Sequence, residues 1–207
     1  MATIVDVNGV VTTNLSATGI STISGLTYPS SDGSSGQYLQ TNGSGALSWQ
    51  TTTNLTRGTA VAANAVSIDF AIPSGVRKIT VIFDQVSVDT DNQLLRVQIG
   101  TGGSPLTSGY LGRCTYLTAS TGNQSNYSGG FDIRHFDRLY DCTGTMTISN
   151  MTGNTWISTH NMSSTGWLTN YYGAGVASLS GELDLIRVCA DGGGTLDNGQ
   201  LNVMYEV

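Results

Sequence analysis

The densest group of chemically capable side chains lies in residues 131–142, which read FDIRHFDRLYDC. The charged and titratable members are Asp132, Arg134, His135, Asp137, Arg138 and Asp141. Hydrolysis would need a histidine paired with an aspartate, or two carboxylates acting as acid and base. Neighbouring residues of a strand, however, point to opposite faces, and this group mixes both charge signs evenly. We therefore interpret it as an exposed strand and loop with Arg–Asp pairs, or as a contact between subunits, and we expect no catalytic residues.

Two acidic loops offer oxygen ligands of the kind that Ca²⁺ prefers. They are residues 88–92 (VDTDN) and 190–199 (ADGGGTLDNG), and neither follows the spacing of a known calcium loop with its terminal Glu. Asp, Asn and Gly also favour β-turns, so we interpret both loops as turns. His160 lies far in sequence from His135, and neither has Cys or Glu at ligand spacing. We predict no metal site and no cofactor.

The aromatic side chains indicate binding rather than catalysis. Tyr127 borders a polar loop, and Trp167, Tyr171 and Tyr172 lie in residues 163–175 (SSTGWLTNYYGAG), which we expect to form a loop between two strands. Flat aromatic rings beside Asn, Ser and Thr are typical of glycan- and protein-binding surfaces. We take these four residues as candidate receptor-binding residues. The alternative is that Trp167 caps the end of the fold and the tyrosines pack between subunits.

The overall composition excludes several classes of protein. Only 11% of the residues are charged, and the formal net charge is −6. An acidic chain lacks the basic surface that nucleic-acid binding requires. No stretch approaches about 18 consecutive apolar residues, so we expect no membrane insertion. The N-terminus has no basic segment followed by a hydrophobic one, so we expect synthesis and folding in a cytoplasm.

From residue 59 onward, short apolar runs alternate with clusters of Gly, Ser, Asn and Asp. We predict strands over residues 65–70, 76–84, 94–99, 110–117, 130–136, 144–150, 154–160, 176–180, 182–189 and 200–206. In 76–84, for example, Ile79, Val81 and Phe83 alternate with polar residues. Many short strands separated by turns favour a β-sandwich or jelly-roll-like head over residues 59–207. The fold class is therefore all-β.

The first 58 residues differ in composition from the rest, because they contain few charged and few apolar side chains. We divide them into a stalk segment, 1–30, and a collar, 31–58, in which residues 36–50 (GQYLQTNGSGALSWQ) read as a hairpin. The apolar residues that must pack are Val5, Val7, Ile20, Ile23, Leu39, Leu47 and Trp49. These residues are too few to form a hydrophobic core within one chain, so we expect them to pack against copies of the same chain. The alternative is a disordered arm.

Several segments resemble the C-terminal domains of tail fibre proteins of tailed bacteriophages. The main one, residues 66–112, carries the family's pattern of an IPS-x-V-K/R-x-I-T-V-x-F strand, then V-S, L-x-V-Q-I-G and T-x-G-Y. Residues 144–160 and 181–207 resemble further strand pairs of that domain. The hairpin 36–50 is similar to one common in phage fibres, and residues 17–26 (ATGISTISGL) resemble the shaft repeats of trimeric fibres, notably from phages of marine cyanobacteria.

The resemblance implies a homotrimeric, non-enzymatic virion protein, made in the host cytoplasm, with a role in structure and host attachment. Its N-terminal segment would join other virion proteins, and its head would contact host-surface glycan. Residues 131–142 and 163–175 are individual to this chain, so no receptor-binding residue carries over from the family. One alternative is a purely structural protein that decorates a capsid or fastens head to tail without a receptor. Another is a glycan hydrolase of the tailspike type.

Overall fold

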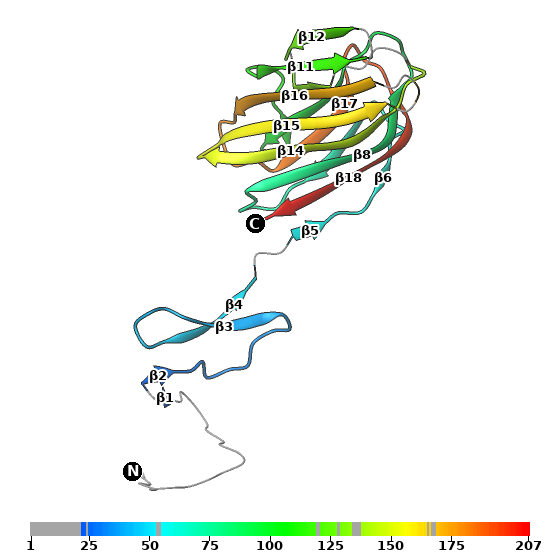
Figure 1. Cartoon of the computed structure of the whole chain (residues 1–207). Coiled ribbons are helices and arrows are strands. Elements are labelled where there is room, and N and C mark those ends of the chain that lie inside the picture. Colours follow the sequence, from blue (N-terminus) through cyan, green and yellow to red (C-terminus); the bar gives the residue numbers. More distant parts are fainter. Residues whose placement is uncertain are drawn as a thin grey trace, which may run out of the picture. The chain divides into compact units, whose positions relative to one another are not determined.

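The computed structural model describes residues 22–23, 25–52, 55–118, 121–127, 129–133, 138–164, 166 and 169–207. Its internal contacts divide the chain into two units, Met1–Thr53 and Asn54–Val207. We call the second unit the head. The described residues form strands and turns without a helix, which confirms the predicted all-β class (Figure 1). None of them therefore belongs to a helix long and apolar enough to cross a membrane.

The first unit contains the predicted hairpin. Strands β3 (Gln37–Thr41) and β4 (Leu47–Thr51) pair antiparallel, and β1 (Thr22–Ile23) pairs with β2 (Leu26–Thr27). The β3–β4 turn is closed by the side chain of Asn42, whose Oδ1 accepts from the backbone N–H of Ser44 at 2.8 Å. Gly43 has a φ of 76°, a left-handed conformation that suits glycine.

The head contains two antiparallel sheets, which we call the large and the small sheet. The large sheet has the strand order β12 (Gly122–Asn126), β11 (Leu111–Leu117), β16 (Thr169–Ser178), β15 (Thr155–Ser164), β14 (Cys142–Thr152), β8 (Lys78–Val88), β18 (Leu196–Glu206) and β5 (Leu55–Arg57), and β6 (Val61–Ala62) also pairs with β18. The small sheet has the order β10 (Ser104–Pro105), β9 (Leu95–Thr101), β17 (Leu185–Ala190) and β7 (Ser67–Ala71), and β13 (Phe131–Ile133) also pairs with β9.

The two sheets share one hydrophobic core, as in a β-sandwich. Ile79, Val81 and Phe83 of β8 are buried from the large sheet, and Ile186 and Val188 of β17 are buried from the small one. Alternation along β8 follows from the pleat of a strand, which sends successive side chains to opposite faces. The outer face of the large sheet is therefore lined by the residues that lie between the buried ones.

The boundary between the units lies earlier than the expected one at residue 58. Residues 55–57, which we assigned to the collar, form β5 and pair with the end of β18, with Leu55 opposite Glu206. This pairing is between residues far apart in sequence, so no local pattern predicts it. The head therefore includes this strand.

Two segments of the head also differ from the prediction. Residues 163–175, expected to be a loop, contain the first half of β16, which begins at Thr169. Strand β12, Gly122–Asn126, is entirely polar apart from its glycine and was not predicted. Both strands lie toward one edge of the large sheet, where pairing with β11 holds them.

The head has two distinct ends. β5 begins beside Glu206, so the chain enters the head at the end where β18 finishes. Strands β8, β15 and β17 end at the opposite end of the head, which we call the far end, and strands β9, β14, β16 and β18 begin there (Figure 1). Residues 138–141, which directly precede β14, and Gly166, between β15 and β16, therefore lie at the far end.

Candidate functional site

The structure separates the four aromatic binding candidates. Tyr127 and Tyr171 are 7% and 0% exposed and belong to the core, whereas Tyr172 is 42% exposed. Trp167 lies outside the described residues. Tyr171 and Tyr172 are consecutive residues of β16, so they point to opposite faces. The predicted receptor-binding role is therefore corrected for Tyr127 and Tyr171, whose side chains are almost entirely buried.

Tyr127 follows β12 and packs against glycines of the large sheet. A Cβ on Gly112 would lie 2.7 Å from its Cε2, and a Cβ on Gly173 would lie 2.9 Å from its hydroxyl oxygen. Gly175 contacts the same ring edge. Glycine in a strand often marks the close approach of another group, and here that group is the Tyr127 ring. The tyrosine therefore anchors its own loop on the inner face of the large sheet.

The inner face of β15 carries an unusual number of polar side chains. Ser158, His160 and Ser164 are all buried there. Burial lowers the pKa of His160 to about 4, so the imidazole is neutral at pH 7. Burial raises the pKa of Tyr171, and the hydroxyl of Ser164 opposes part of that shift. These groups lie inside the core, where they cannot meet a substrate.

The exposed Tyr172 lies on the outer face of the large sheet among uncharged hydrogen-bonding groups. In the strand register it lies between Thr115 of β11 and Asn161 of β15. Asn170 shares its face, two residues earlier on β16. We call Thr115, Asn161, Asn170 and Tyr172 the Tyr172 face. An aromatic ring flanked by hydroxyl and amide groups can contact the C–H face of a sugar and hydrogen-bond its hydroxyls.

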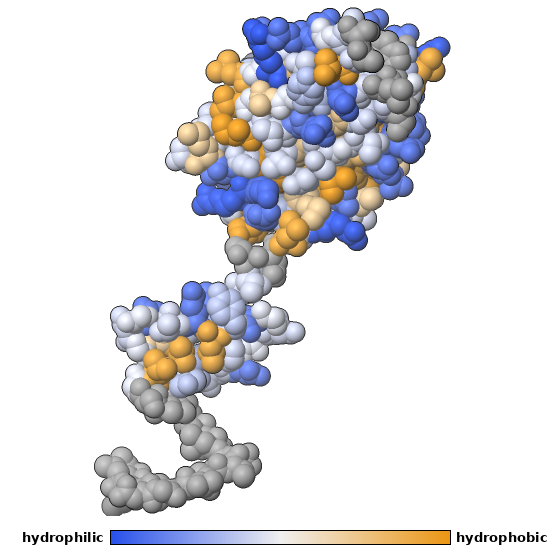
Figure 2. Space-filling view, viewed as in Figure 1, coloured by the Kyte–Doolittle hydropathy of each residue, from blue (hydrophilic) through white to orange (hydrophobic). Residues whose placement is uncertain are grey.

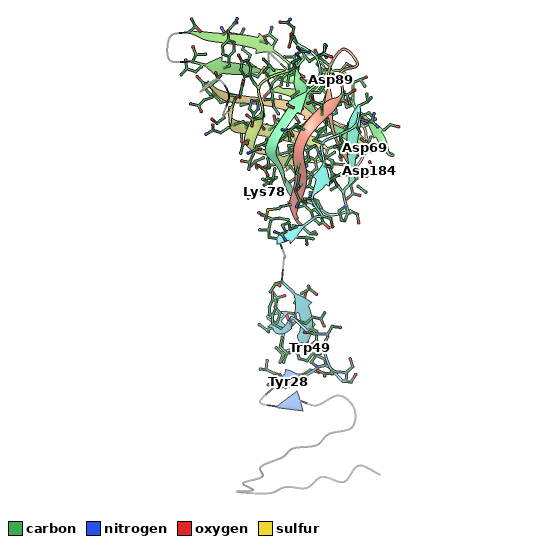
Figure 3. All side chains as sticks on the ribbon, turned by 90° about the vertical axis from the view of Figure 1, so that its right-hand side faces the viewer. Tyr28, Trp49, Asp69, Lys78, Asp89 and Asp184 are labelled. Atoms are coloured by element: carbon green, nitrogen blue, oxygen red, sulfur yellow. The ribbon has the colours of Figure 1, made fainter. Side chains whose placement is uncertain are left out.

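Arg113 and Lys78, two charged residues of this outer face, are held by other side chains. Arg113, next to the Tyr172 face on β11, donates from Nη1 to Oε1 of Gln124 at 3.0 Å. Lys78 and Glu206 form an ion pair of 2.9 Å at the end where the chain enters the head, and Lys78 is labelled in Figure 3. The arrangement suits binding of a neutral polar ligand. The four described residues of the Tyr172 face include no carboxylate and no imidazole.

The stalk-packing candidates fall into three groups. Val5, Val7 and Ile20 lie outside the described residues, and only the backbone of Ile23 is described, in β1. Leu39 and Trp49 are opposite each other in the hairpin. Within residues 25–52 no side chain is buried, and Leu39, Leu47 and Trp49 are half-buried or exposed. Figure 2 shows apolar residues on the surface of this unit. The described hairpin therefore has no core of its own.

Within residues 131–142, Asp132 does not lie on the exposed strand that we expected. Asp132 is fully buried and accepts from Nε of Arg96, on β9, at 2.9 Å. Its partner thus comes from another strand. Arg134, His135 and Asp137 lie outside the described residues. Arg138 and Asp141 line a shallow cleft at the far end of the head.

The acidic loops use their carboxylates to close turns. Oδ1 of Asp89 accepts from the backbone N–H of Thr195 and from the hydroxyl of Thr90, both at 2.9 Å (Figure 3). The hydrogen bond from Thr195, and after it the one from Thr90, lower the pKa of Asp89. Oδ1 of Asp191 accepts from the N–H of Leu94 at 2.6 Å. Among the described residues, no three His, Cys, Asp or Glu side chains are arranged to hold a metal ion.

A comparison of the whole sequence with models of protein families finds no matching family, and a comparison with curated proteins finds no match either.

Proposed function

We propose that the chain is a non-enzymatic, homotrimeric fibre protein of a virion. Its head binds the host surface. Its N-terminal segment joins other virion proteins. The resemblance of residues 36–50 and 66–112 to phage tail fibres supports this function. The observation that carries it is the contrast between the units, since all buried residues of the described chain lie between Ala63 and Val203.

The missing core of the hairpin favours association between copies. Full burial of a large apolar side chain contributes roughly 1.5–3 kcal/mol. Leu39, Leu47 and Trp49 gain little of this in a single chain, because none of them is buried there. Ordering a residue costs about 1–2 kcal/mol, so an unburied segment of this kind gains order by packing against its copies. Sparse charge in the segment means that the copies repel each other little.

Attachment to a host-surface glycan is assigned to the Tyr172 face. A glycan is rich in hydroxyl groups and C–H surface, and Tyr172 with Thr115 and Asn161 offers groups that match both. Because the four residues of this face include no carboxylate or imidazole that could act as acid or base, we expect binding of the glycan without its cleavage. Purified protein incubated with host polysaccharide should release no reducing ends, and sustained release would contradict the non-enzymatic part of the proposal.

A second candidate function is a purely structural virion protein without a receptor, such as a capsid decoration. The burial of Tyr127 and Tyr171 favours it, because it leaves fewer aromatic rings for a ligand. A glycan-binding screen of the full chain separates the two functions. The fibre proposal expects binding that Tyr172→Ala weakens and that Met151→Ala, another exposed apolar residue of the head, leaves unchanged. Absence of binding to any host glycan would favour the structural protein.

A further inference from the structure

A shallow cleft of about 310 Å³ opens at the far end of the head. It is lined by Ser87, Arg138, Leu139, Asp141, Gly166 and Asn198. These residues come from β8, from the β13–β14 connection, from the β15–β16 turn and from β18. The far end is opposite the end at which the chain enters the head, so the cleft is on the side away from that entry.

The β8 and β18 side of the cleft is held by hydrogen bonds of its own. The hydroxyl of Ser87 donates to Oδ1 of Asp197. Nδ2 of Asn198 donates to the carbonyl oxygen of Gln85 at 3.1 Å. These contacts fix the side chains while leaving the carbonyl oxygen of the Asn198 amide to accept from a ligand. A site whose polar groups are already oriented loses less entropy on binding.

The opposite side of the cleft carries an Arg, a carboxylate and an apolar side chain. The backbone N–H of Arg138 donates to Oδ1 of Asp91 at 3.0 Å, which anchors the chain at this residue. Its guanidinium makes no hydrogen bond or ion pair with the described residues. Leu139, the next residue, is 73% exposed, and Asp141 completes this side. An anchored Arg whose side-chain donors no described residue uses, beside an exposed leucine, is a combination that suits a ligand.

We propose that this cleft binds one neutral sugar residue of the host-surface glycan, as a second contact besides the Tyr172 face, a step that rests on the proposed function. The guanidinium of Arg138 donates to sugar hydroxyls, the carboxylate of Asp141 and the amide of Asn198 accept from them, and Leu139 contacts C–H groups. One cation and one carboxylate cancel in charge, so an anionic sugar would gain from Arg138 but be repelled by Asp141. The volume lies at the lower limit of small-molecule sites, which is too small for a folded partner.

The test compares affinities of full-chain variants for a neutral host glycan identified by an array. Arg138→Ala and Leu139→Ala change exposed side chains, so both variants should keep the wild-type melting temperature. Loss of a hydrogen bond to a charged group costs about 1.5–3 kcal/mol, so Arg138→Ala should raise Kd roughly ten- to a hundredfold. Arg57→Ala, at the entry end of the head, is the matched control and should leave Kd unchanged.

Three results would overturn the assignment. If Tyr172→Ala abolishes binding while Arg138→Ala and Leu139→Ala leave it unchanged, glycan attachment stands and the cleft is not its site. If the array selects only acidic glycans, the neutral ligand class is wrong. If no glycan binds, the cleft assignment fails together with the proposed attachment.

Discussion

The indole ring of Trp49 lies over Gly33, so closely that a Cβ on that glycine would be 2.6 Å from the ring. Its Nε1 donates to the carbonyl oxygen of Ser31 at 2.9 Å. The largest side chain of the hairpin thus contacts Gly33, donates a hydrogen bond to Ser31 and stays half-buried. Packing of its exposed part against copies of the chain is the central element of the proposed fibre.

Replacing Trp49 by Ser should weaken self-association without changing the head. Three copies would each lose the burial of one indole, about 1.5–3 kcal/mol per chain. Sedimentation velocity over a dilution series should show dissociation at higher concentrations than for the wild type. Gln40→Ala, an exposed change in the same hairpin, is the control. Equal association of Trp49→Ser and wild type would remove this residue from the contact between copies.

Gly175→Ala should destabilise the head, because the added Cβ would lie 2.6 Å from the carbonyl oxygen of Leu111 and would overlap the Tyr127 ring. Overpacking of this kind typically costs about 1–3 kcal/mol. Urea unfolding measures the loss. Gly122→Ala is the matched control, since its Cβ would lie 3.3 Å from the end of the Leu117 side chain and 3.7 Å from the carbonyl oxygen of Tyr116. Similar unfolding midpoints for the two variants would show that Tyr127 does not occupy the space above Gly175.

These glycines also explain why one strand of the large sheet could not be predicted from the sequence. The alternation of Ile79, Val81 and Phe83 is a local pattern, and it predicted a strand at 76–84, where β8 covers Lys78–Val88. In β16, Gly173 and Gly175 stand at inward positions that would normally carry apolar side chains, so the segment read as a loop. Their partner, Tyr127, comes from a different loop, and no local pattern shows that pairing.

The candidate site was predictable only in part for the same reason. The sequence identified an aromatic cluster near polar residues but not which rings are exposed. Once β16 is known to be a strand, alternation assigns Tyr171 to the core and Tyr172 to the surface. The far-end cleft combines Arg138 with Ser87 and Asn198, which are brought together by long-range pairing of β8 and β18. Composition and spacing carry no information about such a pairing.

Acid should destabilise the head through His160. The pKa of this buried imidazole is about 4, below its ordinary value of 6.5, so the unfolded chain takes up the proton first. The free energy of unfolding is therefore unaffected by His160 above pH 6.5 and falls between pH 6.5 and pH 4, by roughly 3 kcal/mol in all. Unfolding in urea at several pH values measures this slope.

The control for the acid effect is a comparison of both histidines. His160→Gln should flatten the dependence between pH 6.5 and pH 4, while His135→Gln reports how much belongs to the other histidine of the sequence. A slope that survives His160→Gln unchanged would rule out this residue as its source.

Two ion pairs of the small sheet should differ in their contribution to stability. Arg96 and Asp132 form a buried pair at 2.9 Å, whereas Arg187 and Asp69 form a partly exposed, two-point pair at 2.7 Å. Asp132→Ala leaves Arg96 with the longer contact to Asp191, at 3.6 Å, and should cost up to about 3–5 kcal/mol. Asp69→Ala should cost about 1 kcal/mol or less. Thermal unfolding of the two variants tests the order, and a larger loss for Asp69→Ala would reverse it.

The mass of the full chain in solution tests the fibre account most directly, with a chain beginning at Asn54 measured alongside. Light scattering at low micromolar concentration should give three times the chain mass of 21.6 kDa for the full chain. The shortened chain keeps the whole described core, so it should stay folded but associate more weakly or not at all. A full chain that is a clean monomer of 21.6 kDa would contradict the account.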